Sequence, residues 1–132
     1  MSQEADDEAE ALEGKLNKAL DEAWTKVSRA SEVTSNESSE VPAILHQAAE
    51  AVEFSSALFS LTYGLEDFDP EVKIKRNSEP VALVKESLEL LRKSRELRKV
   101  SSREAYSNLR TAADYLKTAF LRQSKRPRVK TG

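Results

Sequence analysis

The sequence predicts an all-α protein, a bundle of three or four helices around a buried central helix. The stretch between Pro42 and Gly64 is apolar or small on nearly every side, with Glu50 and Glu53 as its only full charges. Such a helix has to be covered by other helices, and the flanking segments repeat apolar residues at helical spacing. Three glycines and four prolines in 132 residues leave little room for a turn-rich β protein.

Length and composition indicate one domain with two charged ends. We expect an acidic, flexible N-terminus over residues 1–10, a helical bundle domain over 11–122 and a basic tail over 123–132. The absence of cysteine excludes disulfides and thiolate metal sites. The acidic N-terminus does not resemble a signal or transit peptide. The apolar stretch is interrupted too often by Ser, Glu and His for a membrane span, so we expect no membrane partner.

The first helix is expected over residues 5–30. Its apolar stripe at steps of four and three consists of Leu12, Leu16, Leu20, Trp24 and Val27. The simplest role for Trp24 is a core anchor against the central helix, and the alternative is a hot spot for a partner protein. A polar loop is expected over 31–40.

The central helix is expected over residues 43–63. Ser39 or Glu40 can cap its start, and Pro42 suits its first turn, where no amide hydrogen is needed. Gly64 can end it in the left-handed conformation. We expect Leu65 and Phe68 to fold back over the core as lids.

The last two helices are expected to form an antiparallel hairpin. The third opens at Ser78-Glu79-Pro80 and runs to about Lys99, after a connector over 71–78. The fourth begins at Ser101-Ser102-Arg103-Glu104, where serine and a glutamate three residues later form a capping box. The short spacing between them makes the two helices neighbours.

The formal net charge of −2 hides an asymmetry between the halves of the chain. Residues 1–72 hold 17 Asp or Glu against 4 Lys or Arg, whereas residues 73–132 hold 6 against 17. One interpretation is intramolecular, with acidic and basic helices packed side by side. The other is that the C-terminal half faces a polyanion, because Lys and Arg displace counterions from phosphate backbones.

Two basic segments are candidates for that second interpretation. The first lies at the tip of the predicted hairpin and the second in the C-terminal tail. Together the candidate nucleic-acid-binding residues are Arg92, Lys93, Arg95, Arg98, Lys99, Arg103, Lys125, Arg126, Arg128 and Lys130. The run Lys125-Arg126-Pro127-Arg128 also fits a nuclear import signal, so we expect a nuclear protein. Because aromatic residues are not interleaved with the cations, we expect contacts to the backbone of RNA.

Catalytic chemistry has little support in the sequence. The single histidine, His46, has no cysteine or second histidine to complete a zinc site or a Ser-His-Asp arrangement. There is no glycine-rich phosphate loop. We therefore expect a non-enzymatic protein with no catalytic residues, no metal, no cofactor and no small-molecule substrate.

The order of motifs resembles the small helical nuclear proteins that bind nucleic acid and serve as cofactors of the RNA exosome and its associated exonuclease. The resemblance covers about residues 41–98. The matching segments are Ser56-Ala57-Leu58-Phe59-Ser60-Leu61-Thr62-Tyr63, Asp69-Pro70, Glu79-Pro80-Val81 with Leu88 and Leu91, and Lys125 to Lys130. The connector 71–78 is longer than in that family, and the tail has fewer lysines.

The resemblance implies a protein partner and RNA. The first helices would intertwine with the N-terminal helices of the exonuclease, and the tail would grip structured RNA during rRNA processing. The residues facing the partner would then be Leu16, Leu20, Trp24 and Val27. The alternatives are a structural subunit of a chromatin, kinetochore or tethering complex that binds no nucleic acid, and a self-contained bundle whose charges only satisfy each other.

Overall fold

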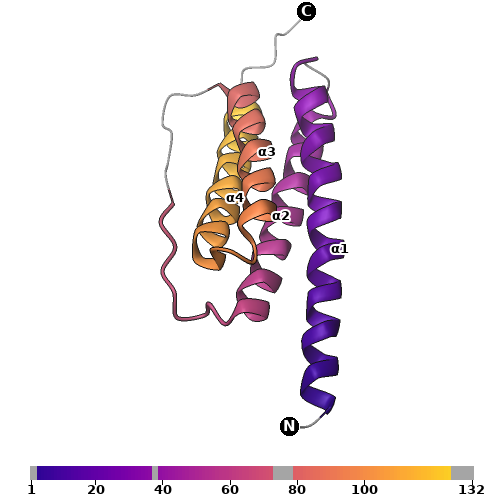
Figure 1. Cartoon of the computed structure of the whole chain (residues 1–132). Coiled ribbons are helices and arrows are strands. Elements are labelled where there is room, and N and C mark those ends of the chain that lie inside the picture. The colour runs from indigo at the N-terminus through magenta and orange to yellow at the C-terminus, as the bar shows by residue number, and fades with distance from the viewer. Residues whose placement is uncertain (1–2, 37–38, 73–78, 126–132) are drawn as a thin grey trace, which may run out of the picture.

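The protein folds into helices throughout the residues that its computed structural model describes, 3–36, 39–72 and 79–125 (Figure 1). Within these ranges there are four helices and no strand. Their bounds are α1 (Gln3–Thr34), α2 (Val41–Tyr63), α3 (Pro80–Leu97) and α4 (Ser102–Lys125). The predicted all-α class and helical bundle are confirmed.

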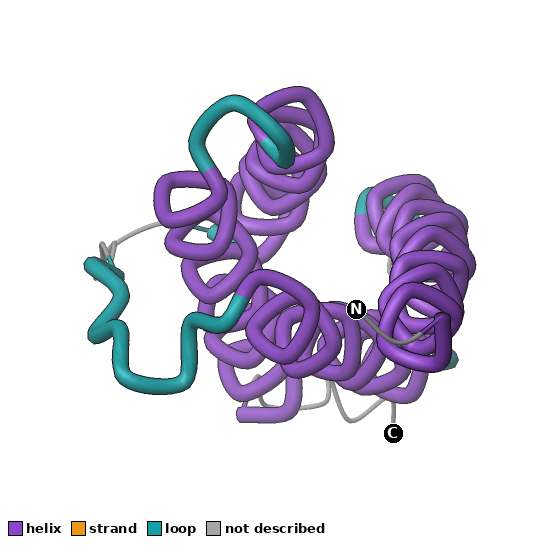
Figure 2. Tube along the Cα trace, turned by 60° about the horizontal axis from the view of Figure 1, so that its bottom comes forward, coloured by secondary structure: helices purple, strands orange, loops and turns teal. Residues whose placement is uncertain are grey.

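The four helices form a ring in which each packs against two others. α1 contacts α2 and α3, and α4 contacts the same two helices, so α1 lies diagonally opposite α4. Neighbouring helices run antiparallel (Figure 1). The chain therefore has to return from the end of α2 to the opposite end of the bundle before α3 begins. Figures 1 and 2 place the described part of this crossover on the side of the bundle away from α1. One long crossover is a known variant of the four-helix bundle.

The core runs the length of the ring and receives large side chains from all four helices. The largest side chains with no accessible surface include Leu16, Leu45, Phe59, Leu83, Leu91, Leu109 and Leu116. α4 alternates its leucines with buried alanines, which lets α3 pack closely against it. At this contact the buried hydroxyl of Ser87 donates to the carbonyl of Leu83 at 2.8 Å and approaches that of Ala112 at 3.2 Å. The buried serine is thus satisfied by backbone carbonyls of both helices.

The structure does not place α2 at the centre of the bundle. α2 packs on α1 and α4 only, and one face of it is open to solvent. Phe54 and Leu61 on that face are 60% and 55% exposed. We expected α2 to be enclosed because its residues are apolar or small around its whole circumference. Composition, however, does not show which side of a helix packs against another helix.

The C-terminal end of α2 follows the prediction. Gly64 adopts the left-handed conformation with φ 63° and ψ 46°, and the amide of Leu65 donates to the carbonyl of Ser60 at 2.9 Å. Leu65 is buried and Phe68 is half-buried against the core, as expected of the two lids. Both α2 and α3 carry proline in their first turn.

The structure differs from the sequence analysis at both ends of α1. The helix begins at Gln3, inside the segment expected to be flexible, and extends past the ends of the other helices (Figure 1). Carboxylates near a helix N-terminus interact favourably with its dipole, and Glu and Ala are strong helix formers. At the other end α1 continues to Thr34, whose hydroxyl donates to the carbonyl of Ala30. Residues 73–78 of the connector and 126–132 of the basic tail lie outside the described residues.

Candidate functional site

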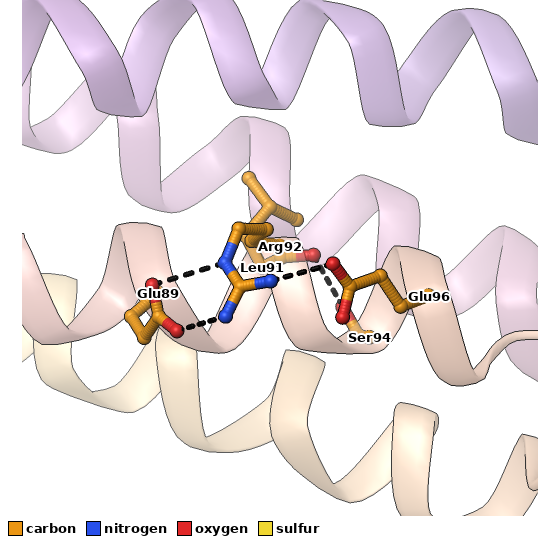
Figure 3. Close-up of polar contacts among 5 residues, drawn as sticks. All are labelled: Glu89, Leu91, Arg92, Ser94 and Glu96. Atoms are coloured by element: carbon orange, nitrogen blue, oxygen red, sulfur yellow. Dashed lines mark hydrogen bonds and ion pairs between the residues drawn. The ribbon is translucent and has the colours of Figure 1, made fainter.

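Arg92, the first cation of the predicted basic cluster, is held by two carboxylates of its own helix (Figure 3). Its Nε donates to Oε2 of Glu89 at 3.1 Å, its Nη2 pairs with the other oxygen of that carboxylate, and its Nη1 donates to Oε1 of Glu96 at 2.5 Å. The hydrogen bond from Arg92 lowers the pKa of Glu89, and the same contacts raise the pKa of Arg92. Arg92 is therefore neutralised locally on the exposed face of α3.

Arg95 and Arg98 reach from α3 to the acidic helix α1. Nη2 of Arg95 lies 2.5 Å from Oδ1 of Asp21. The side chain of Arg98 is only 11% exposed, and its Nε donates to the hydroxyl of Tyr63 at 2.9 Å. Its Nη1 donates to Oδ1 of Asn17, and its Nη2 lies 3.5 Å from Oε1 of Glu13. Arg98, at the C-cap of α3, thus joins the end of α3 to the end of α2 and to the middle of α1, and is not available to a phosphate.

The remaining cations of the tip stay open to solvent. Lys93, Lys99 and Arg103 are exposed and form no salt bridge with a carboxylate in the described part of the chain. The guanidinium of Arg103 lies over the ring of Phe68, 5.5 Å from its centroid. This arrangement is a cation–π contact between the start of α4 and the crossover.

The tip and Lys125, the first of the predicted tail cations, lie at opposite ends of α4. The α3–α4 turn lies at one end of the bundle, and α4 runs from there to the opposite end (Figure 1). A helix of 24 residues separates the two by about 36 Å. Of the predicted tail residues, Lys125 ends α4, whereas Arg126, Pro127, Arg128 and Lys130 lie outside the described residues.

The side chains predicted to face a partner lie mainly inside the chain's own core. Leu16, Leu20 and Val27 are buried, and Trp24 is half-buried against the same core. A partner could reach the first three only if α1 left the bundle. This places Trp24 in the role of core anchor, the first of the two roles that the sequence allowed.

The apolarity of the central helix predicts an exposed patch for a partner, but its residues, on the outward face of α2, were not singled out from the sequence. We call outward face the exposed residues of α2 at alternating spacings of four and three, which are Ala43, Gln47, Glu50, Phe54, Ala57 and Leu61. Phe54 and Leu61 are its two large exposed apolar side chains, and Ala57 lies between them. The signal that could have found it is this spacing, which repeats on the side of α2 opposite its buried residues.

The carboxylates of α2 at and beside the outward face are Glu50 and Glu53. Glu53 forms an ion pair with Lys117 of α4, and Nε2 of His46 lies 2.7 Å from Oε1 of Glu50. The ring of His46 also lies 5.5 Å from that of Phe120, at the edge between α2 and α4. No lysine or arginine occurs between residues 30 and 72 of the sequence.

A hollow of about 640 Å³ lies between the crossover and the α3–α4 hairpin. Its lining residues are Phe68, Asp69, Glu71, Leu90, Lys93, Leu97, Arg103, Glu104, Ser107, Asn108, Thr111 and Tyr115. Cations and carboxylates occur there in similar number. The charge of the hollow therefore selects neither an anionic nor a cationic ligand.

The described residues contain no group of three or more His, Cys, Asp or Glu that could hold a metal ion. None of the helices over 3–36, 39–72 and 79–125 is both long and apolar enough to cross a membrane. Comparison with protein-family models, curated proteins and solved structures gives no match. The function has to be argued from the surface of the bundle itself.

Proposed function

We propose that this chain is a non-enzymatic helical interaction module that binds a protein partner through the outward face of α2. The observation that carries the proposal is the exposure of Phe54 and Leu61, 60% and 55%, on the most apolar helix of the bundle. Neither side chain contributes to the core, so stability of the bundle does not explain an aromatic and a leucine there. Aromatic and aliphatic anchors of this kind carry most of the energy of protein interfaces.

The proposed role is the adaptor or subunit role expected from the sequence. The proposed contact surface differs, because it lies on α2 instead of α1. The resemblance to exosome cofactors placed the partner on Leu16, Leu20, Trp24 and Val27. The burial of three of these in the chain's own core favours the outward face of α2 instead. Nuclear localisation stays part of the proposal and rests on the sequence Lys125-Arg126-Pro127-Arg128.

Co-purification with matched variants tests the proposal. The tagged full chain is compared with Phe54→Ser combined with Leu61→Ser, and with the control Val100→Ser. Val100 lies in the turn between α3 and α4 and is 85% exposed. We expect the first variant to lose a partner that the wild type and the control retain. Equal retention by all three chains would contradict the proposal.

A second candidate function is RNA contact at the α3–α4 turn. It is favoured by the exposure of Lys93, Lys99 and Arg103 without a salt bridge to a described carboxylate. A gel-shift titration with structured RNA tests it, comparing the wild type with Lys93→Ala, Lys99→Ala and Arg103→Ala combined and with a chain lacking residues 123–132. Binding that weakens in either variant and falls steeply with salt supports RNA contact. No binding at low salt rules it out.

A further inference from the structure

The outward face of α2 has the spacing of a coiled-coil seam. Its members, from Ala43 to Leu61, alternate steps of four and three, an average repeat of 3.5 residues. The inner face of α2 is already used, because Leu45, Val52 and Phe59 are buried in the ring of four helices. α2 therefore carries a second seam, about 27 Å long, that no described residue of this chain covers.

The seam has an apolar part and a charged part. Phe54 and Leu61 flank the small Ala57, which leaves a gap between two large side chains for a knob from a facing helix. One turn before Phe54 the seam contains Glu50, whose carboxylate is 2.7 Å from His46. Nε2 of His46 can donate a hydrogen bond to this carboxylate, whose side chain stays 65% exposed.

A second copy of the chain does not satisfy this seam. An antiparallel copy centred on it sets Glu50 against Phe54, and a parallel copy sets Glu50 against Glu50. Both arrangements desolvate the Glu50 carboxylate with no Lys or Arg of the facing α2 opposite it, which is unfavourable. α2 itself contains no Lys or Arg that could compensate.

We infer that the occupant of the outward face is an amphipathic helix of another protein, with apolar residues along Phe54, Ala57 and Leu61 and a Lys or Arg opposite Glu50. The inference rests on the proposed function and specifies the chemistry of its partner. Charges at and beside a coiled-coil seam set the choice of partner and its register. Glu53 already forms an ion pair with Lys117. Glu50 is therefore the carboxylate of the seam that would attract the Lys or Arg of the partner helix.

Disulfide capture tests the inference, because the chain has no cysteine of its own. Ala57→Cys places a single thiol in the seam of the full chain, and Ala82→Cys places one at an exposed alanine of α3 as the matched control. The probes are two synthetic 21-residue helices with the same Leu and Ala seam and one cysteine. One probe has Lys at both ends of the seam and the other has Glu, so that helix direction does not matter. Mixed disulfide is quantified at equilibrium in a thiol–disulfide buffer.

At Ala57→Cys we expect the Lys probe to be captured roughly ten-fold more than the Glu probe. Adding Glu50→Lys should abolish or reverse this preference, and Ala82→Cys should capture both probes weakly and equally. Equal capture of both probes at Ala57→Cys, above the control, overturns the charge inference and leaves the proposed docking face intact. Capture at the control level overturns docking of helices, and so does preferential formation of Ala57→Cys homodimers. The co-purification experiment decides the proposed function separately.

Discussion

At the scale of single residues, the arginines at and near the end of α3 have different roles that their sequence spacing does not distinguish. One binds carboxylates of the same helix, and the others join α3 to other helices. Arg92, Arg95 and Arg98 are spaced three apart in one basic run, yet Arg98 is mostly buried and Arg92 is exposed. Their partners differ as well, since Arg98 contacts Asn17 and Tyr63 of distant helices. These long-range partners depend on how the helices pack in the ring, which the sequence of the basic run does not reveal. From the sequence alone, all six cations of the tip were therefore expected to contact phosphates in the same way.

Arg98 is expected to stabilise the fold. Replacing it by methionine keeps most of the aliphatic length and removes the donors to Tyr63 and Asn17, which should lower the free energy of unfolding by about 2 kcal/mol. Urea unfolding measures the change. The adjacent exposed Lys99→Met should change stability by less than about 0.5 kcal/mol. Equal effects at the two positions would show that Arg98 does not join the three helices.

Glu89 is expected to titrate below the ordinary range of a glutamate. The hydrogen bond from Arg92 lowers the pKa of its carboxyl, so Arg92→Gln should raise that pKa, whereas the distant Lys99→Gln should leave it unchanged. Carbon-detected NMR titration of the Glu89 carboxyl group measures this pKa in the wild type and in both variants. A depressed pKa in the folded state means that the contribution of Glu89 to stability is present above its unfolded-state pKa and is lost as pH falls through the folded value. An unchanged pKa in Arg92→Gln would contradict the contact.

At the scale of elements, periodicity together with the positions of proline and glycine predicted most helix boundaries. The side-chain cap expected at the start of α2 is not formed, because the N-cap Glu40 makes no capping hydrogen bond with its side chain. The central helix, expected over 43–63, spans Val41–Tyr63 and ends at a left-handed Gly64. The first helix was expected from residue 5 and begins at Gln3, and its first turns fall in the segment 1–10 that was interpreted as flexible because of its charge. The residues of the outward face of α2 were not singled out, because an apolar helix has no polar stripe to show which side meets solvent.

Two phenylalanines of α2 should respond very differently to truncation. Phe59 has no accessible surface, so Phe59→Ala should cost about 3–5 kcal/mol, a large part of the stability of a domain of this size. Phe54→Ala removes an exposed ring and should change stability by less than about 0.5 kcal/mol. Urea unfolding with an unchanged m-value checks both variants. A comparable loss in Phe54→Ala would mean that the ring is covered within the isolated chain.

At the scale of the whole molecule, part of the charge asymmetry is resolved between helices. The ion pairs Asp21–Arg95, Glu13–Arg98 and Glu53–Lys117 each join an acidic residue of the first two helices to a basic residue of the last two. This supports the intramolecular interpretation of the two charged halves. The order of helices around the ring was not predictable, because an amphipathic stripe shows that a helix has a neighbour without showing which one.

In the proposed complex, the folded bundle binds its partner through the outward face of α2 while α1 stays in place. Hydroxyl-radical footprinting of the co-purified complex against the free chain tests this most directly. We predict that Phe54 and Leu61 become protected in the complex, while Val100, exposed in the turn between α3 and α4, reacts as before. Unchanged reactivity of Phe54 and Leu61, together with altered reactivity of Trp24 and Leu20 on α1, would contradict the account.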